Sequence, residues 1–331
     1  MRLARIACFT LAAFVSVPAQ AAEWRVQQVD TPARVSAIRS VDGQVRVNAG
    51  GLWYALTLNG PQAKLEFLEK SAPAELIEGA LPDGVVAIGS RDIARAWLAE
   101  PTDRYDHGIL GNKIEASSLV IETRDGKRQT VRLKDDAVFE DLEPRLADLD
   151  GDGHDEIVVV KSYLKRGSAL AIIAERKGKY EIVAETPPIG QPHAWLNPAG
   201  IADFTGSGKL GIALVRMPHV LGNLELWSFA GKSLRKIAGM ADAANHVAGT
   251  RALHMSGAAD FDGDDIADLA IPSLDRGNLR IVSFAPNARE IATVALPAKA
   301  ATNIGLVKAA SGPPAIAVGL TDGTLALIRK D

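Results

Sequence analysis

The 331-residue sequence is poor in cysteine, in net charge and in long apolar runs. Its one cysteine, Cys8, lies close to the amino terminus, so disulfide bonds and thiol chemistry are excluded from the rest of the chain. No segment after residue 21 approaches the roughly 20 consecutive apolar residues of a membrane helix, and we expect no membrane span. The formal net charge of −3 argues against a nucleic-acid partner.

Local signatures of catalysis are also missing. The chain has no nucleophile elbow, no His-Glu-x-x-His pair, no phosphate-binding loop and no dinucleotide fingerprint. The six histidines are scattered along the sequence. A catalytic histidine site would therefore have to be assembled by the fold.

The amino terminus has the pattern of a secretory signal peptide. Arg2 and Arg5 precede an apolar stretch at residues 6–17, and Ala-Gln-Ala at residues 19–21 is a small-x-small cleavage site. We expect residues 1–21 to be removed and the mature protein to be periplasmic or secreted.

Three segments repeat one pattern, at residues 147–173, 202–227 and 259–282. Each begins with Ala-Asp followed by Leu or Phe, passes through a Gly-rich turn and continues as an apolar run rich in β-formers. The opening aspartates lie 55 and 57 residues apart. This period suits one four-stranded β-propeller blade and is too long for a solenoid coil.

Within the first repeat the sequence predicts four short strands, at residues 145–149, 156–161, 168–174 and 180–184. The run Ile-Val-Val-Val at residues 157–160 does not alternate with polar residues. It therefore predicts a strand that is covered on both faces, as in a stack of sheets.

The same pattern extends beyond the three repeats. Residues 33–69 and 74–134 predict two earlier units, and residues 301–329 predict three strands of a last one. A strand at residues 24–29 belongs to no unit and would supply the missing fourth, which closes the ring and removes exposed sheet edges. We expect one all-β domain at residues 22–331, a β-propeller of four-stranded antiparallel blades with six blades, or seven as the alternative.

Two repeats carry carboxylates at positions one, three, five and nine of the turn. They are Asp148, Asp150, Asp152 and Glu156 in the first loop and Asp260, Asp262, Asp264 and Asp268 in the third. With the carbonyl of the seventh residue, His154 or Ile266, they would form an oxygen-only cage that suits Ca²⁺. Carboxylates this close repel one another unless a cation neutralises them. We expect Ca²⁺ as the cofactor, the alternative being an acidic turn without metal.

These loops differ from a helix-flanked calcium loop, because the twelfth position holds Val159 or Ile271 where a glutamate is needed. The spacing instead resembles the calcium-binding β-hairpin loops of the FG-GAP and VCBS repeat families, which are integrin-α-like. The loop carboxylates and the apolar runs 157–160 and 269–271 carry the resemblance, which covers residues 145–282. It implies a propeller with calcium loops and says little about activity.

The other loop positions modify this expectation. The second loop keeps the turn glycines but only Asp203 of the four carboxylates, so we expect no strong metal site there. In the third loop Asp265 replaces the sixth-position glycine, where a left-handed backbone is expected. Aspartate tolerates that conformation better than most residues, so binding would be weakened without being lost.

Strand direction predicts a ligand-binding face at the end of each unit opposite the acidic turns. The candidate ligand-binding residues there are Tyr105, His107, Arg145, His193, Trp195, Asn197, Arg216, His219, His246 and Arg251. The loop expected at residues 91–115 also carries Trp97. Arginine and histidine donors beside aromatic rings would suit an anionic or sugar-like ligand. The alternative is structural, with tryptophans filling the core and histidines capping turns.

The repeats, the acidic loops and the missing catalytic signatures favour an exported, monomeric and non-enzymatic binding or scaffold module. Its ligand would be a protein or a carbohydrate. The competing hypothesis is a propeller hydrolase or lyase that acts on a sugar or ester through an axial site of histidine, arginine and carboxylate. A deep axial funnel with a histidine and a carboxylate in hydrogen-bond reach would favour the enzyme, and a shallow polar surface would favour binding.

Overall fold

The computed structural model describes residues 23–68 and 77–330. These residues form 25 β-strands and contain no helix, which confirms the all-β class. It follows that no helix in the described ranges is long and apolar enough to cross a membrane. The predicted signal peptide, residues 1–21, lies outside the described residues.

The first sheet contains four antiparallel strands in sequence order. They are β2 (Val35–Val41), β3 (Gln44–Ala49), β4 (Leu52–Asn59) and β5 (Gln62–Phe67). Asp42 and Gly43 connect the first two strands with φ angles of 51° and 74°. A two-residue hairpin turn needs positive φ at both positions to match the twist of its strands, and Asp-Gly meets that need.

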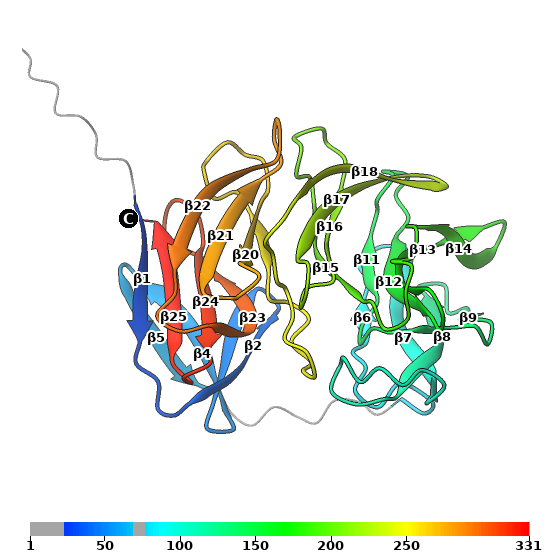
Figure 1. Ribbon diagram of the computed structural model, residues 1–331, viewed down its shortest axis with the longest axis horizontal. Helices are drawn as coiled ribbons and strands as arrows, with labels where there is room; N and C mark the ends of the chain where they lie inside the picture. The colour runs from blue at the N-terminus through cyan, green and yellow to red at the C-terminus, as the bar shows by residue number, and fades with distance from the viewer. Residues whose placement is uncertain (1–22, 69–76, 331) are drawn as a thin grey trace, which may run out of the picture.

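The last sheet joins the two ends of the described chain. Its strands are β23 (Ala300–Val307), β24 (Ala315–Leu320), β25 (Leu325–Lys330) and β1 (Trp24–Val29). β1 pairs antiparallel with β25, with Trp24 opposite Lys330 and Val29 opposite Leu325. Figure 1 shows the dark blue β1 beside the red β25. The prediction that residues 24–29 supply the fourth strand of the last unit is confirmed.

Two further four-stranded sheets come from the second and third repeats. The first has β15 (Leu196–Ala202), β16 (Gly211–Arg216), β17 (Asn223–Ala230) and β18 (Ser233–Met240). The other has β19 (Gly257–Ala259), β20 (Asp268–Pro272), β21 (Asn278–Ser283) and β22 (Arg289–Ala295). The inner strands β16 and β20 are almost entirely buried, which agrees with their apolar sequences.

The remaining nine strands form one larger sheet. They are β6 (Ala87–Ile88), β7 (Ile93–Thr102), β8 (Glu115–Thr123), β9 (Arg128–Arg132), β10 (Ala137–Phe139), β11 (Arg145–Ala147), β12 (Glu156–Tyr163), β13 (Gly167–Arg176) and β14 (Lys179–Glu185). The strands β11 to β14 match the four predicted in the first repeat. The short β10 pairs with both β8 and β12 and so joins two groups of four strands.

One expectation on this sheet is wrong. Residues 93–102 belong to strand β7, so the loop expected at residues 91–115 is shorter, and Trp97 lies in a strand and is buried. The guanidinium groups of Arg95 and Arg128 each lie 5.4 Å from the centre of its ring. Arg95 and Arg128 cover the ring as cations, Arg128 from a segment 31 residues away in the sequence.

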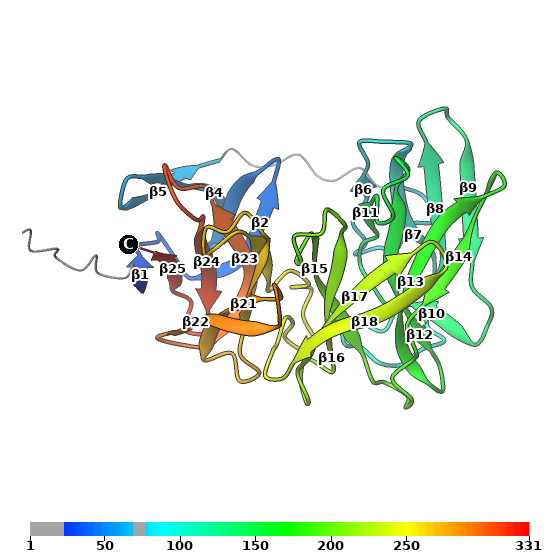
Figure 2. The ribbon, with the colours of Figure 1, turned by 90° about the horizontal axis from the view of Figure 1, so that it is seen from above.

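Apolar cores lie between successive sheets. One core joins β2–β5 to the last sheet, a second joins the last sheet to β19–β22, a third joins β19–β22 to β15–β18, and a fourth joins β15–β18 to the nine-stranded sheet. Figures 1 and 2 show the sheets in this order along the molecule. Among the described residues no such core joins β2–β5 to β6–β9.

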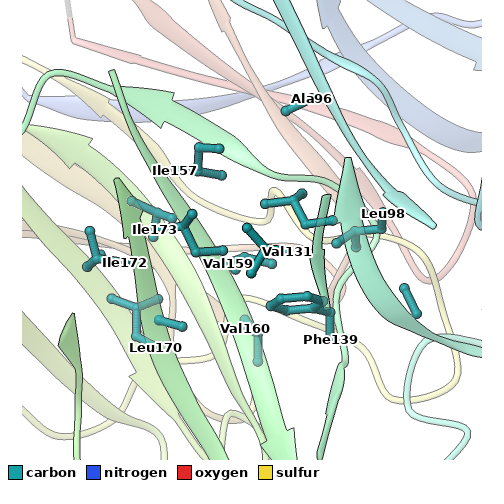
Figure 3. Close-up of a cluster of buried hydrophobic side chains, with 14 of the residues drawn as sticks. Ala96, Leu98, Val131, Phe139, Ile157, Val159, Val160, Leu170, Ile172 and Ile173 are labelled. Carbon is teal, nitrogen blue, oxygen red and sulfur yellow. The ribbon is translucent and has the colours of Figure 1, made fainter. Parts of the chain in front are cut away.

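The largest core is packed on both faces of β12, as the non-alternating run predicted. Ile157, Val159 and Val160 are fully buried there together with Phe139 of β10 and Leu170 of β13. Figure 3 shows these side chains gathered between the strands. This rigid support fixes the position of the acidic loop that precedes β12.

Candidate metal loops and the opposite histidine face

The first acidic loop connects β11 to β12 and is held by its own aspartates. The two oxygens of Asp148 accept the amides of Gly151 and Gly153 at 2.8 and 3.1 Å. Glu156 Oε2 accepts the amide of Leu149 at 2.9 Å. Gly151 and Gly153 have φ angles of 81° and 91°, a left-handed backbone that glycine adopts without strain.

The third loop, between β19 and β20, repeats these bonds position by position. Asp260 accepts the amides of Gly263 and Asp265 at 2.6 and 3.0 Å, and Asp268 Oδ2 accepts the amide of Phe261 at 3.0 Å. Asp265 has a φ of 63°, so the left-handed sixth position predicted from the sequence is confirmed.

Three carboxylates converge in each loop. One oxygen each from Asp148, Asp150 and Glu156 lie within 4.8 Å of one another, and the same holds for Asp260, Asp262 and Asp268. The Oδ1 atoms of Asp150, Asp262 and Asp268 are buried and have no hydrogen-bond partner among the described residues. Buried oxygens that lack a donor are costly, and a cation bound between them would remove that cost.

The electrostatics of the loops agree with this crowding. Burial, together with the charges of Asp150 and Asp152, raises the pKa of Glu156 to about 7, although the hydrogen bond from the Leu149 amide lowers it. Burial likewise raises the pKa of Asp268 to about 6, with Asp262 and Asp264 acting in the same direction. Both groups resist ionisation unless positive charge is supplied.

The other predicted ligands lie beside these groups. Asp152 Oδ1 accepts the amide of His154 at 2.8 Å, and Asp264 Oδ1 accepts the amide of Ile266 at 2.9 Å. The fifth-position aspartates thus close a tight turn and lie outside the three-carboxylate groups. The His154 ring is directed at Asp92, with Nδ1 3.5 Å from Oδ2.

The second loop has the same backbone with different side chains. Asp203 accepts the amides of Thr205, Ser207 and Gly208, and the hydroxyls of Thr205 and Ser207 lie 2.9 Å apart. Gly206 and Gly208 have positive φ, like the glycines of the first loop. The backbone amides satisfy the single carboxylate of this loop.

At the opposite end, three predicted ligand residues form one aromatic cluster. The rings of His107 and His193 are stacked with their centres 5.0 Å apart, and Tyr105 contacts both at its edge. The Tyr105 hydroxyl accepts the amide of His193 at 2.9 Å. His107 Nδ1 lies 2.5 Å from Oε1 of Glu140, whose other oxygen accepts the hydroxyl of Ser162.

A second cluster contains Trp195, His219 and His246. The Trp195 ring is stacked on His219 at 6.2 Å and meets His246 edge-on at 4.8 Å. Because His246 Nε2 donates to the carbonyl of Thr250 at 2.9 Å, its Nδ1 accepts from His219 Nε2 at 3.0 Å. Burial lowers the pKa of His219 to about 4 and that of His246 to about 3, so both rings are neutral at pH 7.

The four remaining candidates are engaged in other contacts. Arg145 pairs with Asp141 at 2.8 Å and Arg251 with Asp83 at 2.7 Å. The amide nitrogen of the fully buried Asn197 donates to the carbonyls of Asn245 and Leu253. Arg216 donates to the carbonyl of Pro187 at 3.4 Å. Asn197 therefore has a structural role, and the two charged pairs compensate buried or half-buried carboxylates.

Sequence reasoning missed Glu115 as a site residue. This side chain begins β8, is 1% exposed, and neither carboxylate oxygen has a hydrogen-bond partner in the described part of the chain. Burial raises its pKa to about 9, and the charges of Glu140 and Asp141 act in the same direction. The only sequence signal was an acidic residue at the start of an apolar run.

Two cavities of about 270 and 280 Å³ are found in other places. The first lies where β1 leads into β2, beside Arg34 and Asp322. The second lies over β3 and β4, beside Val307 and Lys308. Neither is lined by a residue of the histidine clusters or of the acidic loops.

No family model matches the sequence, and no curated protein matches it. Among solved structures the chain is similar to the Photorhabdus luminescens Tc holotoxin pore, with 14% identity over 94% of this chain and a TM-score of 0.41. It spans 14% of the length of that chain. A likeness this weak supports no argument about fold or function.

Proposed function

We propose that this chain is an exported calcium-binding repeat protein of the FG-GAP or VCBS type, which acts as a non-enzymatic binding or scaffold module. The observation that carries the proposal is the pair of acidic cages, built with the same hydrogen bonds at residues 148–156 and 260–268 and holding buried oxygens without donors. Two cages of the same design, more than a hundred residues apart, argue for a shared ligand.

The donor set favours Ca²⁺ over zinc and copper. Every side chain in the two three-carboxylate groups offers oxygen, and neither group contains histidine or cysteine. Hard oxygen donors from flexible turns suit Ca²⁺, whereas zinc and copper prefer nitrogen or sulfur ligands. When bound, the ion would neutralise the cage and tie the start of β12 or β20 to the turn before it.

The strand order supports a six-bladed propeller for this proposal. The nine-stranded sheet divides into β6–β9 and β11–β14, with β10 as a bridge between them. With β2–β5, β15–β18, β19–β22 and the sheet that contains β1, this division gives six units of four strands. The four apolar cores stack these units one on the next, as radial blades do, and the described residues contain no core between β2–β5 and β6–β9.

The proposed ligand surface is the histidine face, defined here by Tyr105, His107, His193, His219 and Trp195. Three of its rings reach solvent, because His193 is exposed and His107 and His219 are half-buried. Imidazoles beside aromatic rings can form hydrogen bonds with a carbohydrate or a protein loop and stack on it. Because Glu140 is fully buried, it orients His107 and is not presented to a ligand.

A propeller hydrolase or lyase is the second candidate, and one contact favours it. His107 and Glu140 lie in hydrogen-bond reach, the arrangement by which a carboxylate orients a histidine base. Turnover of ester or glycoside substrates that is abolished in Glu140→Gln, with unchanged thermal stability, would favour the enzyme.

Calorimetric titration of metal-free protein with CaCl₂ tests the metal sites. We expect two ions per wild-type chain, one in Asp148→Asn or Asp260→Asn, and none in the double variant. Asp203→Asn is the matched control and should still bind two. Wild-type protein that binds no Ca²⁺ would contradict the assignment.

A glycan array probed with the calcium-loaded protein tests the ligand surface. Binding to a glycan should be lost in a variant with both His193→Ala and His219→Ala and kept in Arg235→Ala, on the outer strand β18. Equal binding by all three proteins would place the ligand elsewhere.

A further inference from the structure

An arginine lies against each acidic cage. Arg91 Nη1 is 3.2 Å from Asp148 Oδ2 and 3.5 Å from Asp155 Oδ1. Arg289 Nη2 is 3.2 Å from Asp262 Oδ2. Asp148 and Asp262 both belong to the three-carboxylate groups, so each guanidinium is attracted by the same negative charge as a bound metal ion would be.

The arginines accompany the cages and are missing from the loop without one. Asp203, at the equivalent position of the second loop, accepts backbone amides and forms no ion pair among the residues that the structure describes. The turn itself therefore does not require a guanidinium. The charge of several crowded carboxylates is the feature that the first and third loops share with each other and not with the second.

Both arginines are more exposed than the carboxylates that they contact, although Arg289 also donates to the carbonyl of Ala285. Their side chains are 46% and 44% exposed, whereas Asp148 and Asp262 are 11% and 20% exposed. A half-exposed guanidinium that turns away regains water around its charge. The carboxylates lack that option, so a tightly bound divalent ion would replace the arginine as their partner.

The two arginines come from different places in the fold. Arg289 begins β22, in the same sheet as the loop that it contacts. Arg91 lies in the turn between β6 and β7, and its neighbour Asp92 accepts the amide of Asp155 at 2.8 Å and the hydroxyl of Tyr180 at 3.2 Å. The first cage thus lies at the contact between the β6–β9 and β11–β14 strand groups, whereas the arginine at the third cage comes from that cage's own sheet.

We infer that Arg91 and Arg289 are built-in counter-cations that neutralise the cages when metal is absent and lower their affinity for Ca²⁺. At the first cage, metal binding would also change the contact of Asp148 and Asp155 with the β6–β7 turn. This inference rests on the calcium sites proposed above. Two arginines outside the repeat motif would thus set the calcium affinity of the two sites.

The test uses the mature chain, residues 22–331, freed of metal and titrated with CaCl₂ in a calorimeter. Arg91→Gln and Arg289→Gln remove one positive charge each and keep a polar side chain of similar length. We expect each variant to bind one of the two ions about three- to tenfold more tightly, the size of effect expected from one partly screened charge. Arg132→Gln is the control, because Arg132 pairs with Glu100 and makes the same change in net charge.

Two further measurements show which site changes and why. In the Asp148→Asn background, Arg91→Gln should leave the one remaining site unchanged. In EDTA, Arg91→Gln should melt below wild type because it loses its ion pairs, and it should gain more in melting temperature when Ca²⁺ is added. A purely structural arginine would lower both melting temperatures equally.

The outcomes separate the two proposals. In one outcome the wild type binds two ions, while Arg91→Gln and Arg289→Gln bind them no more tightly than Arg132→Gln does. That result overturns the counter-cation inference and keeps the calcium sites. Binding that appears only in the arginine variants supports the inference and contradicts calcium binding by the wild type. Failure of every protein to bind Ca²⁺ overturns both.

Discussion

The second loop and the two acidic loops have the same turn and different chemistry. In all three, the first aspartate accepts amides from residues further along the turn, and the fourth and sixth positions have positive φ. The second loop achieves this with Asp203 as its single carboxylate. The first and third loops add carboxylates at positions three and nine that bring oxygens within 4.8 Å of one another.

This comparison separates what the turn needs from what a ligand needs. The turn forms without carboxylates at positions three, five and nine, because the second loop folds with Thr205, Ser207 and Gly211 there. Asp150 and Asp262 each retain a buried oxygen without a donor, which makes the isolated turn less favourable. The carboxylates at position nine also accept a loop amide, whereas the unpartnered oxygens of Asp150 and Asp262 are the feature that the proposed cation would account for.

The largest expected effect is the loss of stability on chelation. Two independent sites at a hundred times their dissociation constant would contribute about 5 kcal/mol, since one site contributes about 2.7 kcal/mol. We expect EDTA to lower the melting temperature of the wild type and CaCl₂ to restore it, measured by circular dichroism. A variant with Asp148→Asn and Asp260→Asn should melt at one temperature in both buffers; a calcium-dependent shift in that variant would place the metal outside these loops.

Glu115 offers a contrast to the cages, because its buried carboxylate belongs to neither three-carboxylate group and accepts no hydrogen bond among the described residues. Its folded pKa of about 9 lies above its unfolded value of about 4.5. The free energy of unfolding therefore decreases as pH rises from 4.5 to 9, and this decrease levels off above pH 9. Glu115→Gln should raise the free energy of unfolding by about 2–4 kcal/mol at pH 8 and change little at pH 4.5.

Urea unfolding at both pH values measures this difference, with and without Ca²⁺. Because Glu115 lies outside the cages, the calcium-induced stabilisation should be the same in Glu115→Gln and in the wild type. A gain at pH 8 no larger than at pH 4.5 would show that Glu115 is ionised in the fold.

Removing a carboxylate from a cage should stabilise the fold without metal and destabilise it with metal bound. In EDTA, Asp150→Asn relieves repulsion and gains an amide donor, and we expect stabilisation by about 1 kcal/mol. In saturating CaCl₂ the same change removes a ligand and should destabilise by about 1–2 kcal/mol. Asp203→Asn should show no change of sign, because the second loop has no cage. Destabilisation of Asp150→Asn in both buffers would assign Asp150 to the turn.

The sequence was sufficient to predict features that depend on local pattern. The strand at residues 24–29 and its pairing with the last unit, the four strands β11–β14 and the left-handed Asp265 all follow from periodicity and turn chemistry. Side-chain contacts between distant segments could not be predicted. Nothing near Arg91 in sequence indicates Asp148, and Glu115 differs from a surface glutamate only because other strands cover it.

The smallest expected effect concerns position six, where the two acidic loops differ. Asp265 adopts a φ of 63° that costs an L-residue more than glycine, while Gly153 has a φ of 91° in the first loop. Asp265→Gly should therefore stabilise the calcium-loaded protein by about 0.5 kcal/mol, because relief of strain exceeds the entropy that glycine gains on unfolding. Gly153→Asp is the reciprocal change and should weaken the first site. Calorimetry on both variants checks the pair: if Asp265→Gly leaves the third site no tighter than in the wild type, backbone strain at this position does not limit metal binding.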